Sequence, residues 1–192
     1  MSVRDRFFLE RDKALLVVID VQEKLCVAMD EKVLRQLTKH ICILLEMAGE
    51  LNVPVLITEQ YVKGLGPTLP ELAEKAAGAP CFEKMAFSSC GCTEFVDKLK
   101  ATGRTQIIIT GMETHVCVMQ TVLPLLASGQ QVHVCWDAVS GRGEEYRKHA
   151  LERMAAEGAT LTNHESVAFE WARDKNHPQF KALSALMKEG QP

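Results

Sequence analysis

Three residues with chemically useful side chains lie at or near the ends of apolar runs. Asp20 ends the first run, Lys84 lies in an aromatic segment, and Cys117 follows a third run. A proton acceptor, a cation and a thiol are together what nucleophilic catalysis by cysteine requires. Each also has a structural interpretation. Asp20 can cap a helix or a turn, Lys84 can be a solvated surface residue, and Cys117 can be a small thiol packed at a helix start.

The segment TGMETHVC (110–117) is the most informative of the three places. It follows an apolar run and turns into a helix near Thr114, a residue type that favours the N-cap position. Cys117 would lie in the first helical turn, where unpaired N–H groups and the helix dipole favour the thiolate. The same N–H groups can hold a developing oxyanion. The sequence therefore predicts a nucleophilic thiol at this position.

Short apolar runs alternate with amphipathic segments along the chain, which predicts β-strands joined by helices. The predicted strands are 14–19, 53–58, 81–88 (with its exit), 105–110, 131–136 and 159–163. The predicted helices are 31–50, one beginning at Pro70, 92–101, 114–128, 143–157 and 177–188. Near-continuous apolar strands with intervening helices are typical of a parallel sheet that is covered on both faces.

We therefore expect one α/β domain over residues 1–192, with three α/β/α layers and a mostly parallel, doubly wound, Rossmann-like sheet. In such sheets ligands bind outside the carboxyl ends of the strands. Asp20, Lys84 and Cys117 all belong to segments at that edge, so their side chains are expected to converge in one crevice.

Composition narrows the class of partner and the cellular location. The net charge of −3 gives no electrostatic reason to expect nucleic acid or an anionic membrane. No apolar run reaches the roughly 18 residues of a membrane span, and the charged N-terminus lacks the apolar core of a signal peptide. The seven scattered cysteines fit free thiols better than a disulfide framework, so a cytoplasmic protein is expected.

The motifs, taken in order, resemble those of the isochorismatase-like cysteine hydrolases. The matching segments are ALLVVIDVQ, FEKMAFS, ITGMETHVCV and VHVCWDAVSGR, within residues 12–172. The stretch TEQYVKGLGPTLPEL (58–72) is closest to the isochorismatase-domain subgroup rather than to the nicotinamidases.

This resemblance implies roles for individual residues. Asp20, Lys84 and Cys117 match the family's catalytic triad, and the backbone N–H groups of Glu113 and Cys117 match its oxyanion hole. The family has a cis peptide at the position of Met112–Glu113. The resemblance also implies hydrolysis of a C–N bond in a small amide or related acyl compound, no organic cofactor, and a homo-oligomer, either a dimer or a tetramer.

Two departures from related branches refine this expectation. Gln60 and Val62 occupy the positions of the metal-binding Asp-x-His pair of nicotinamidases, so no metal is expected there. True isochorismatases lack the nucleophilic cysteine, so Cys117 argues against isochorismate as the substrate.

Four further residues are weaker candidates for substrate binding. Gln22, Tyr61 and Phe87 fall on loops that leave strand ends, and His115 is adjacent to the nucleophile. For Phe87, core packing is an equal alternative, and for His115 the alternative is an exposed helix position.

Two other function classes remain open at this point. The chain could be a non-catalytic, oligomeric binding or scaffold protein that retains the fold. It could also be a redox-sensing thiol protein, which would need a resolving cysteine near Cys117. Cys26 and Cys135 fit that role only if the fold brings them close.

Overall fold

The structure, a computed structural model, describes residues 8–76 and 78–190. Its centre is a six-stranded sheet in the order β3-β2-β1-β4-β5-β6. All neighbouring pairs are parallel. The strands are β1 (Ala14–Ile19), β2 (Val55–Gln60), β3 (Cys81–Lys84), β4 (Gln106–Met112), β5 (Gln131–Ser140) and β6 (Thr160–Thr162). The predicted three-layer, doubly wound α/β/α fold is confirmed, with a sheet that is wholly parallel.

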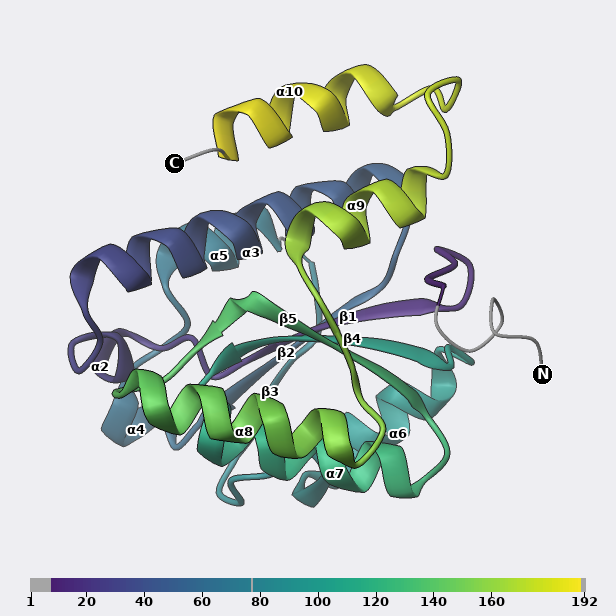
Figure 1. The fold of residues 1–192 in the computed structure, drawn as a ribbon. Coiled ribbons are helices and arrows are strands. Elements are labelled where there is room, and N and C mark those ends of the chain that lie inside the picture. The colour runs from purple at the N-terminus through teal and green to yellow at the C-terminus, as the bar shows by residue number, and fades with distance from the viewer. Residues whose placement is uncertain (1–7, 77, 191–192) are drawn as a thin grey trace.

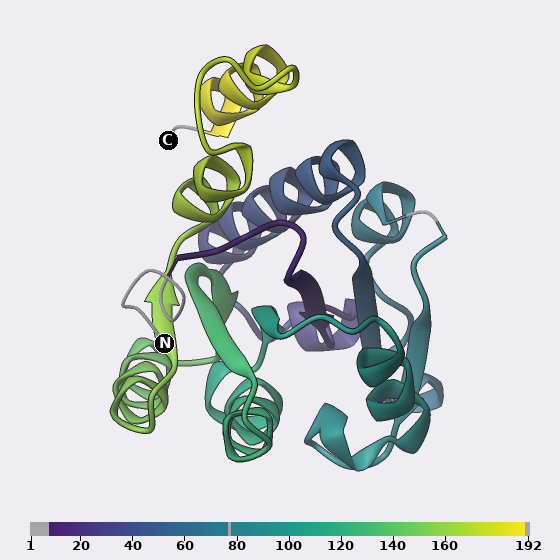
Figure 2. The same ribbon diagram turned by 90° about the vertical axis from the view of Figure 1, so that its right-hand side faces the viewer.

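Helices cover both faces of the sheet (Figures 1 and 2). On one face lie α3 (Glu31–Leu51), α5 (Pro70–Lys75) and α9 (His164–Ala172), with α10 (Phe180–Gly190) packed outside α3 and α9. The other face carries α6 (Thr93–Ala101), α7 (Met119–Ala127) and α8 (Glu144–Ala156). The short elements are α2 (Glu23–Cys26), α4 (Val62–Leu65), the 3₁₀ turn η1 (Ser89–Gly91) and the π-helical turn η2 (Thr114–Val118).

Burial on both faces explains why β1 is apolar at every position. Leu16 and Val18 pack into the core beneath α3, while Leu15 and Val17 pack into the core above α6 and α7. Side chains alternate between faces along a strand, so a central parallel strand must be apolar throughout. No helix in the described part of the chain is long and apolar enough to cross a lipid bilayer.

Among the elements that differ from the sequence-based prediction are β2, β5 and α9. Strand β2 begins at Val55 rather than at residue 53, because Pro54 has no N–H to donate to a sheet ladder. Strand β5 continues to Ser140 through an irregularity in its register with β4. Helix α9 was not predicted, although Asn163 caps it by accepting a hydrogen bond from the Ser166 N–H at 2.7 Å.

The direction of winding reverses between β1 and β4. The chain runs from β1 outward to β2 and β3, and then returns to place β4 on the other side of β1. At this point Gly111 brings the end of β4 against β1, since a Cβ on Gly111 would lie 2.0 Å from the Ile19 carbonyl oxygen. Gly111 also has a φ of +111°, which only glycine adopts without strain. The end of β1 therefore lies directly beside the end of β4, which leads to Cys117. This place, where the winding of the sheet reverses, is its topological switch point.

Candidate active site

Two of the three predicted catalytic side chains form a buried ion pair at the carboxyl edge of the sheet. Lys84 Nζ, at the end of β3, donates to Asp20 Oδ2 across 2.6 Å. Asp20 is 0% exposed and Lys84 3%. Strand β2 lies between the two parent strands, so the lysine spans it to reach the carboxylate. The expected convergence of these two residues is therefore present in the structure.

The lysine ammonium is held by oxygen atoms on all sides. Besides Asp20, Nζ donates to Gln60 Oε1 at 2.9 Å and to the Phe87 carbonyl at 2.9 Å. The Ala86 carbonyl lies at 3.3 Å. A buried charge is tolerated only when it is paired and hydrogen-bonded in this way. These bonds also explain why β3 stops at Lys84, because the chain must turn there to present its carbonyls to the ammonium.

Asp20 is positioned by its backbone as well as by its partner. Its φ is 51°, in the left-handed region where aspartate is one of the more tolerated residues. Its Oδ1 accepts a hydrogen bond from Thr58 Oγ1 at 2.8 Å. The carboxylate thus has a donor on each oxygen, which holds it in one orientation.

Cys117 lies in the π-helical turn η2, which leads from β4 into α7, and its residue is 5% exposed. Its thiol lies close enough to Asp20 to share a hydrogen bond with the carboxylate, and this bond favours the protonated form of the thiol. Burial first, and then the charge of Asp20, raise the pKa of Cys117 to about 12. The charge of Lys84 and a hydrogen bond to the backbone of Glu113 lower the pKa of the thiol, but by less. The thiol is therefore protonated at neutral pH and faces a carboxylate that can accept its proton.

Two expectations about this turn were wrong. The helix start does not supply a preformed thiolate, because burial and the neighbouring Asp20 carboxylate raise the pKa of the Cys117 thiol. Thr114 does not cap the helix either. The N-cap position is Glu113, and Thr114 Oγ1 is buried without a hydrogen-bond partner among the described residues.

The peptide between Met112 and Glu113 is cis, as the family resemblance implied. The side chain of Glu113 is anchored outside the site by Arg142, whose Nε donates to Glu113 Oε1 at 2.8 Å. This ion pair connects the turn to the loop after β5. It holds the Glu113 backbone next to the thiol, where the resemblance places one oxyanion N–H.

Gln22 is fully occupied in holding the loop beside the site. Its Nε2 donates to the Gln60 carbonyl at 3.0 Å and to the Gly66 carbonyl at 2.6 Å. Its Oε1 accepts from the Gln60 N–H at 2.7 Å. The structure therefore shows Gln22 bracing the end of β2, and its contact with a substrate stays a prediction.

The other three weak candidates lie nearer to solvent. Tyr61 and Phe87 are exposed side chains, and the ring of Tyr61 lies against Gly64. His115 is half-buried and its ring lies 5.1 Å from that of Tyr146. Its Nδ1 is buried without a hydrogen-bond partner among the described residues. These positions are compatible with pocket walls, and their roles remain predictions.

The polar residues that support the ion pair were not predicted from the sequence. Thr58 donates to Asp20, and Gln60, considered only as a departure from a metal site, accepts from Lys84. Deeper in the structure, Thr121 Oγ1 connects the Cys117 carbonyl at 2.7 Å with Ser89. Thr58 directly follows three apolar residues of β2, and a buried hydroxyl needs a hydrogen-bond partner. This residue could therefore have pointed to a polar group buried beside it.

The fold and this cluster define a doubly wound α/β protein with an enzyme-like site at its switch point. The isochorismatase domain family matches residues 14–166. Isochorismatase domain-containing protein 2A of Mus musculus is 38% identical over 184 residues, covering 94% of this chain and 85% of the mouse protein. The chain belongs to the isochorismatase family, and its fold is that of an isochorismatase-like hydrolase.

Two solved structures agree with this assignment. The MAR1 ribonuclease of Caenorhabditis elegans matches with a TM-score of 0.90 and 35% identity, covering 96% of this chain and 94% of that chain. The YcaC gene product of Escherichia coli, described as an octameric hydrolase of unknown specificity, matches with a TM-score of 0.82 and 27% identity. The match covers 96% of this chain and 98% of the YcaC chain.

The pKa of Cys117 offers a test of the site's electrostatics. Asp20→Asn removes the carboxylate that raises this pKa and leaves Lys84, which lowers it. We therefore expect Cys117 to ionise at lower pH in the variant than in the wild type, whose pKa is about 12. The pH profile of alkylation, followed by mass spectrometry of the Cys117 peptide, measures the shift. An unchanged or higher midpoint would show that Asp20 does not control the thiol.

Proposed function

We propose that this protein is a cysteine hydrolase of the amidase type, cleaving a C–N bond in a small amide or related acyl compound. Cys117 is the nucleophile, Asp20 the general base and acid, and Lys84 the cation that orients Asp20. One observation carries the proposal. The carboxylate that is fixed by Lys84 at 2.6 Å is also the group that faces the protonated thiol. A nucleophile, a base and an orienting group in contact are the recurring unit of covalent catalysis.

In the first half-reaction the thiol attacks the substrate carbonyl carbon. As the C–S bond forms, the Sγ–H proton passes to Asp20, and the carbonyl π electrons move onto oxygen. The backbone N–H groups of Glu113 and Cys117 stabilise this oxyanion. The intermediate collapses, the C–N bond breaks, and Asp20 returns the proton to the leaving nitrogen. The products of this step are a free amine or ammonia and a thioester on Cys117.

In the second half-reaction water attacks the thioester carbonyl while Asp20 accepts a proton from that water. The C–S bond then breaks, and the proton on Asp20 returns to the sulfur. The carboxylic acid leaves, and the resting thiol is restored. Asp20 acts twice as base and twice as acid, which requires a carboxylate that is ionised at rest. Lys84 Nζ, which donates to Asp20 Oδ2 across 2.6 Å, holds that carboxylate in place through both half-reactions.

Burial of the reacting groups favours a small substrate. Asp20, Lys84 and Cys117 are all at most 5% exposed, so a polymer backbone has little access to them. The nematode relative is named a ribonuclease. Here the net charge of −3 gives no electrostatic basis for binding RNA. A small molecule is accordingly the proposed partner, with neither metal nor organic cofactor in the chemistry.

The two alternative functions fit the structure less well. Cys26 and Cys135 pack in the core under α3, whereas Cys117 packs on the opposite face of the sheet. The sheet separates these cysteines from Cys117, which argues against either as a resolving thiol. Burying an ion pair rarely makes a protein more stable than apolar residues would. A purely structural scaffold would therefore have no evident reason to keep the buried Asp20–Lys84 pair.

We further propose that the protein acts in the cytoplasm. All seven cysteines are free, with Cys117 among them. A reactive thiol and the absence of disulfide pairs both suit a reducing compartment.

The central test is a screen of small amides that follows release of ammonia or amine. Once a substrate is found, Cys117→Ala should abolish turnover, because no acyl-enzyme can form. Asp20→Asn should reduce kcat/KM by at least about a hundredfold. Because Asp20 and Lys84 act as one unit, the double variant Asp20→Asn with Lys84→Met should be nearly as active as Asp20→Asn alone.

Cys42→Ala is the matched control, since Cys42 is a partly buried free thiol on α3 that should not affect turnover. Removing one member of a buried ion pair typically costs about 3–5 kcal/mol of stability. Rates are therefore compared per folded protein, measured by circular dichroism. An active Asp20→Asn enzyme, or fully additive losses in the double variant, would refute the assignment of the base.

We also propose that the chain forms a homo-oligomer, as a dimer or a tetramer. The octameric state described for the E. coli relative supports association in this fold. Exposed apolar side chains such as Trp136 and Phe87 are available for contacts between chains. Multi-angle light scattering should give a mass at least twice the 21.3 kDa of one chain. A mass of 21.3 kDa at micromolar concentration would contradict the proposal.

A further inference from the structure

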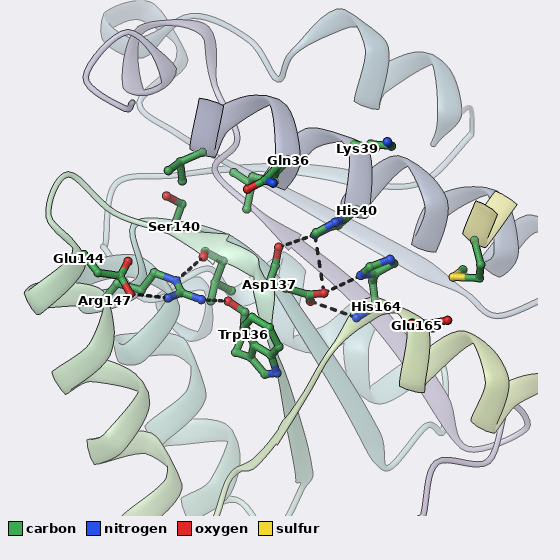
Figure 3. A pocket seen from close by; sticks show the side chains of 14 residues that line it. Gln36, Lys39, His40, Trp136, Asp137, Ser140, Glu144, Arg147, His164 and Glu165 are labelled. Atoms are coloured by element: carbon green, nitrogen blue, oxygen red, sulfur yellow. Dashed lines mark hydrogen bonds and ion pairs between the residues drawn. The ribbon is translucent and has the colours of Figure 1, made fainter. Parts of the chain in front are cut away.

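A second group of chemically active side chains lies away from the proposed catalytic site. His40 on α3, Asp137 on β5 and His164 at the start of α9 come together at one side of a pocket of ≈ 470 Å³ (Figure 3). The lining of this pocket includes Trp136 and Gln36 and none of the proposed catalytic residues. The cluster is therefore separate from the reaction described above.

The irregularity in β5 explains how Asp137 reaches this pocket. Ile109 pairs with Val134 and Gly111 with Val139, so two steps along β4 correspond to five along β5. The extra residues form a bulge, and bulges redirect side chains out of the regular alternation. Asp137 consequently turns toward α3 and α9, where it meets both histidines (Figure 3).

Asp137 makes contacts with both rings and with the helix start. Its Oδ1 accepts the His164 backbone N–H at 3.0 Å, and its Oδ2 lies 2.5 Å from His164 Nδ1. His40 Nδ1 lies 2.8 Å from the Asp137 carbonyl oxygen and 3.6 Å from Oδ2. The backbone bond to Oδ1 orients the carboxylate and leaves Oδ2 facing the two imidazoles.

We propose that His40, Asp137 and His164 bind a divalent transition cation of borderline softness, such as Zn²⁺ or Co²⁺. One ligand atom from each residue lies within 4.8 Å of the others. Two imidazoles and one carboxylate are a donor set that suits these cations. At ligand distances near 2.0–2.1 Å, tetrahedral ligand atoms stand about 3.3 Å apart. The observed separations of 3.6 Å and 2.5 Å from Oδ2 lie on either side of that value.

Binding requires only local rearrangement of the two rings. They now stack with centroids 3.9 Å apart and planes 11° from parallel, while His164 shares a hydrogen bond with Oδ2. The cation replaces this hydrogen bond and also the one between His40 Nδ1 and the Asp137 carbonyl oxygen. The rings tilt apart, and both Nδ1 lone pairs then point at the cation. Each neutral ring then carries its hydrogen on Nε2.

Three protein ligands leave at least one coordination position for water or a small molecule, as in zinc sites that bind exchangeable ligands. The adjoining pocket of ≈ 470 Å³ gives such a ligand space and access. The cation would also connect α3, β5 and α9, which are distant in sequence. Binding should therefore raise the unfolding temperature of the protein as well as occupy the pocket.

The test uses the purified full chain after chelator treatment, titrated with Zn²⁺ or Co²⁺ alone. Calorimetry should show one equivalent bound, and nitrogen NMR of the imidazoles should show shifts at His40 and His164. His40→Gln and His164→Gln should each weaken binding at least tenfold. Asp137→Asn should also weaken it, while keeping an oxygen that can accept the His164 N–H.

His149→Gln is the matched control, because His149 is exposed and lies near two carboxylates without a second histidine. It should bind the cation as the wild type does. Three results would overturn the inference. The first is that no equivalent of cation binds, and the second is that the His40 and His164 signals do not change, which would assign the cation to thiols. The third is that His149→Gln weakens binding as much as the variants of the cluster do. If His164→Gln does not fold, His40→Gln decides, because His40 lies on α3 and contacts α9 through ring stacking on His164, whereas His164 is the first residue of α9.

Discussion

The buried ion pair between Lys84 and Asp20 is the interaction on which the site depends. Transferring each charge from water costs several kcal/mol, and the cost is offset only by close pairing and further hydrogen bonds. The structure meets this demand with a 2.6 Å contact, the carbonyls after β3 and the hydroxyl of Thr58. The strand order permits this contact, because only β2 lies between β3, which carries Lys84, and β1, which leads into Asp20.

The ion pair also influences the thiol of Cys117, the proposed nucleophile. Burial, and then the charge of Asp20, raise the pKa of the Cys117 thiol to about 12, and in the proposed reaction the same carboxylate takes the proton. A protonated thiol is a weak nucleophile compared with the thiolate. This arrangement protects a buried cysteine from random electrophiles, whereas a permanent thiolate would be exposed to oxidation.

The sequence was sufficient to predict the sheet and the three candidate catalytic residues. Apolar runs identify buried parallel strands, and polar residues at their ends mark the ligand-binding edge. The protonation state of Cys117 could not be read in this way, because it reflects burial and the carboxylate of a residue 97 positions earlier. The cluster of His40, Asp137 and His164 was likewise hidden, since a bulge in β5 and an unpredicted helix bring its members together.

The most direct measurement is to capture the covalent intermediate on Cys117. A substrate labelled with heavy isotopes in its acyl portion would be mixed with enzyme, quenched in acid during turnover, and digested for mass spectrometry. We expect the peptide that contains Cys117 to gain the mass of the labelled acyl group, and hydroxylamine to remove it. Turnover without an adduct, or an adduct on any other residue, would contradict catalysis by this cysteine.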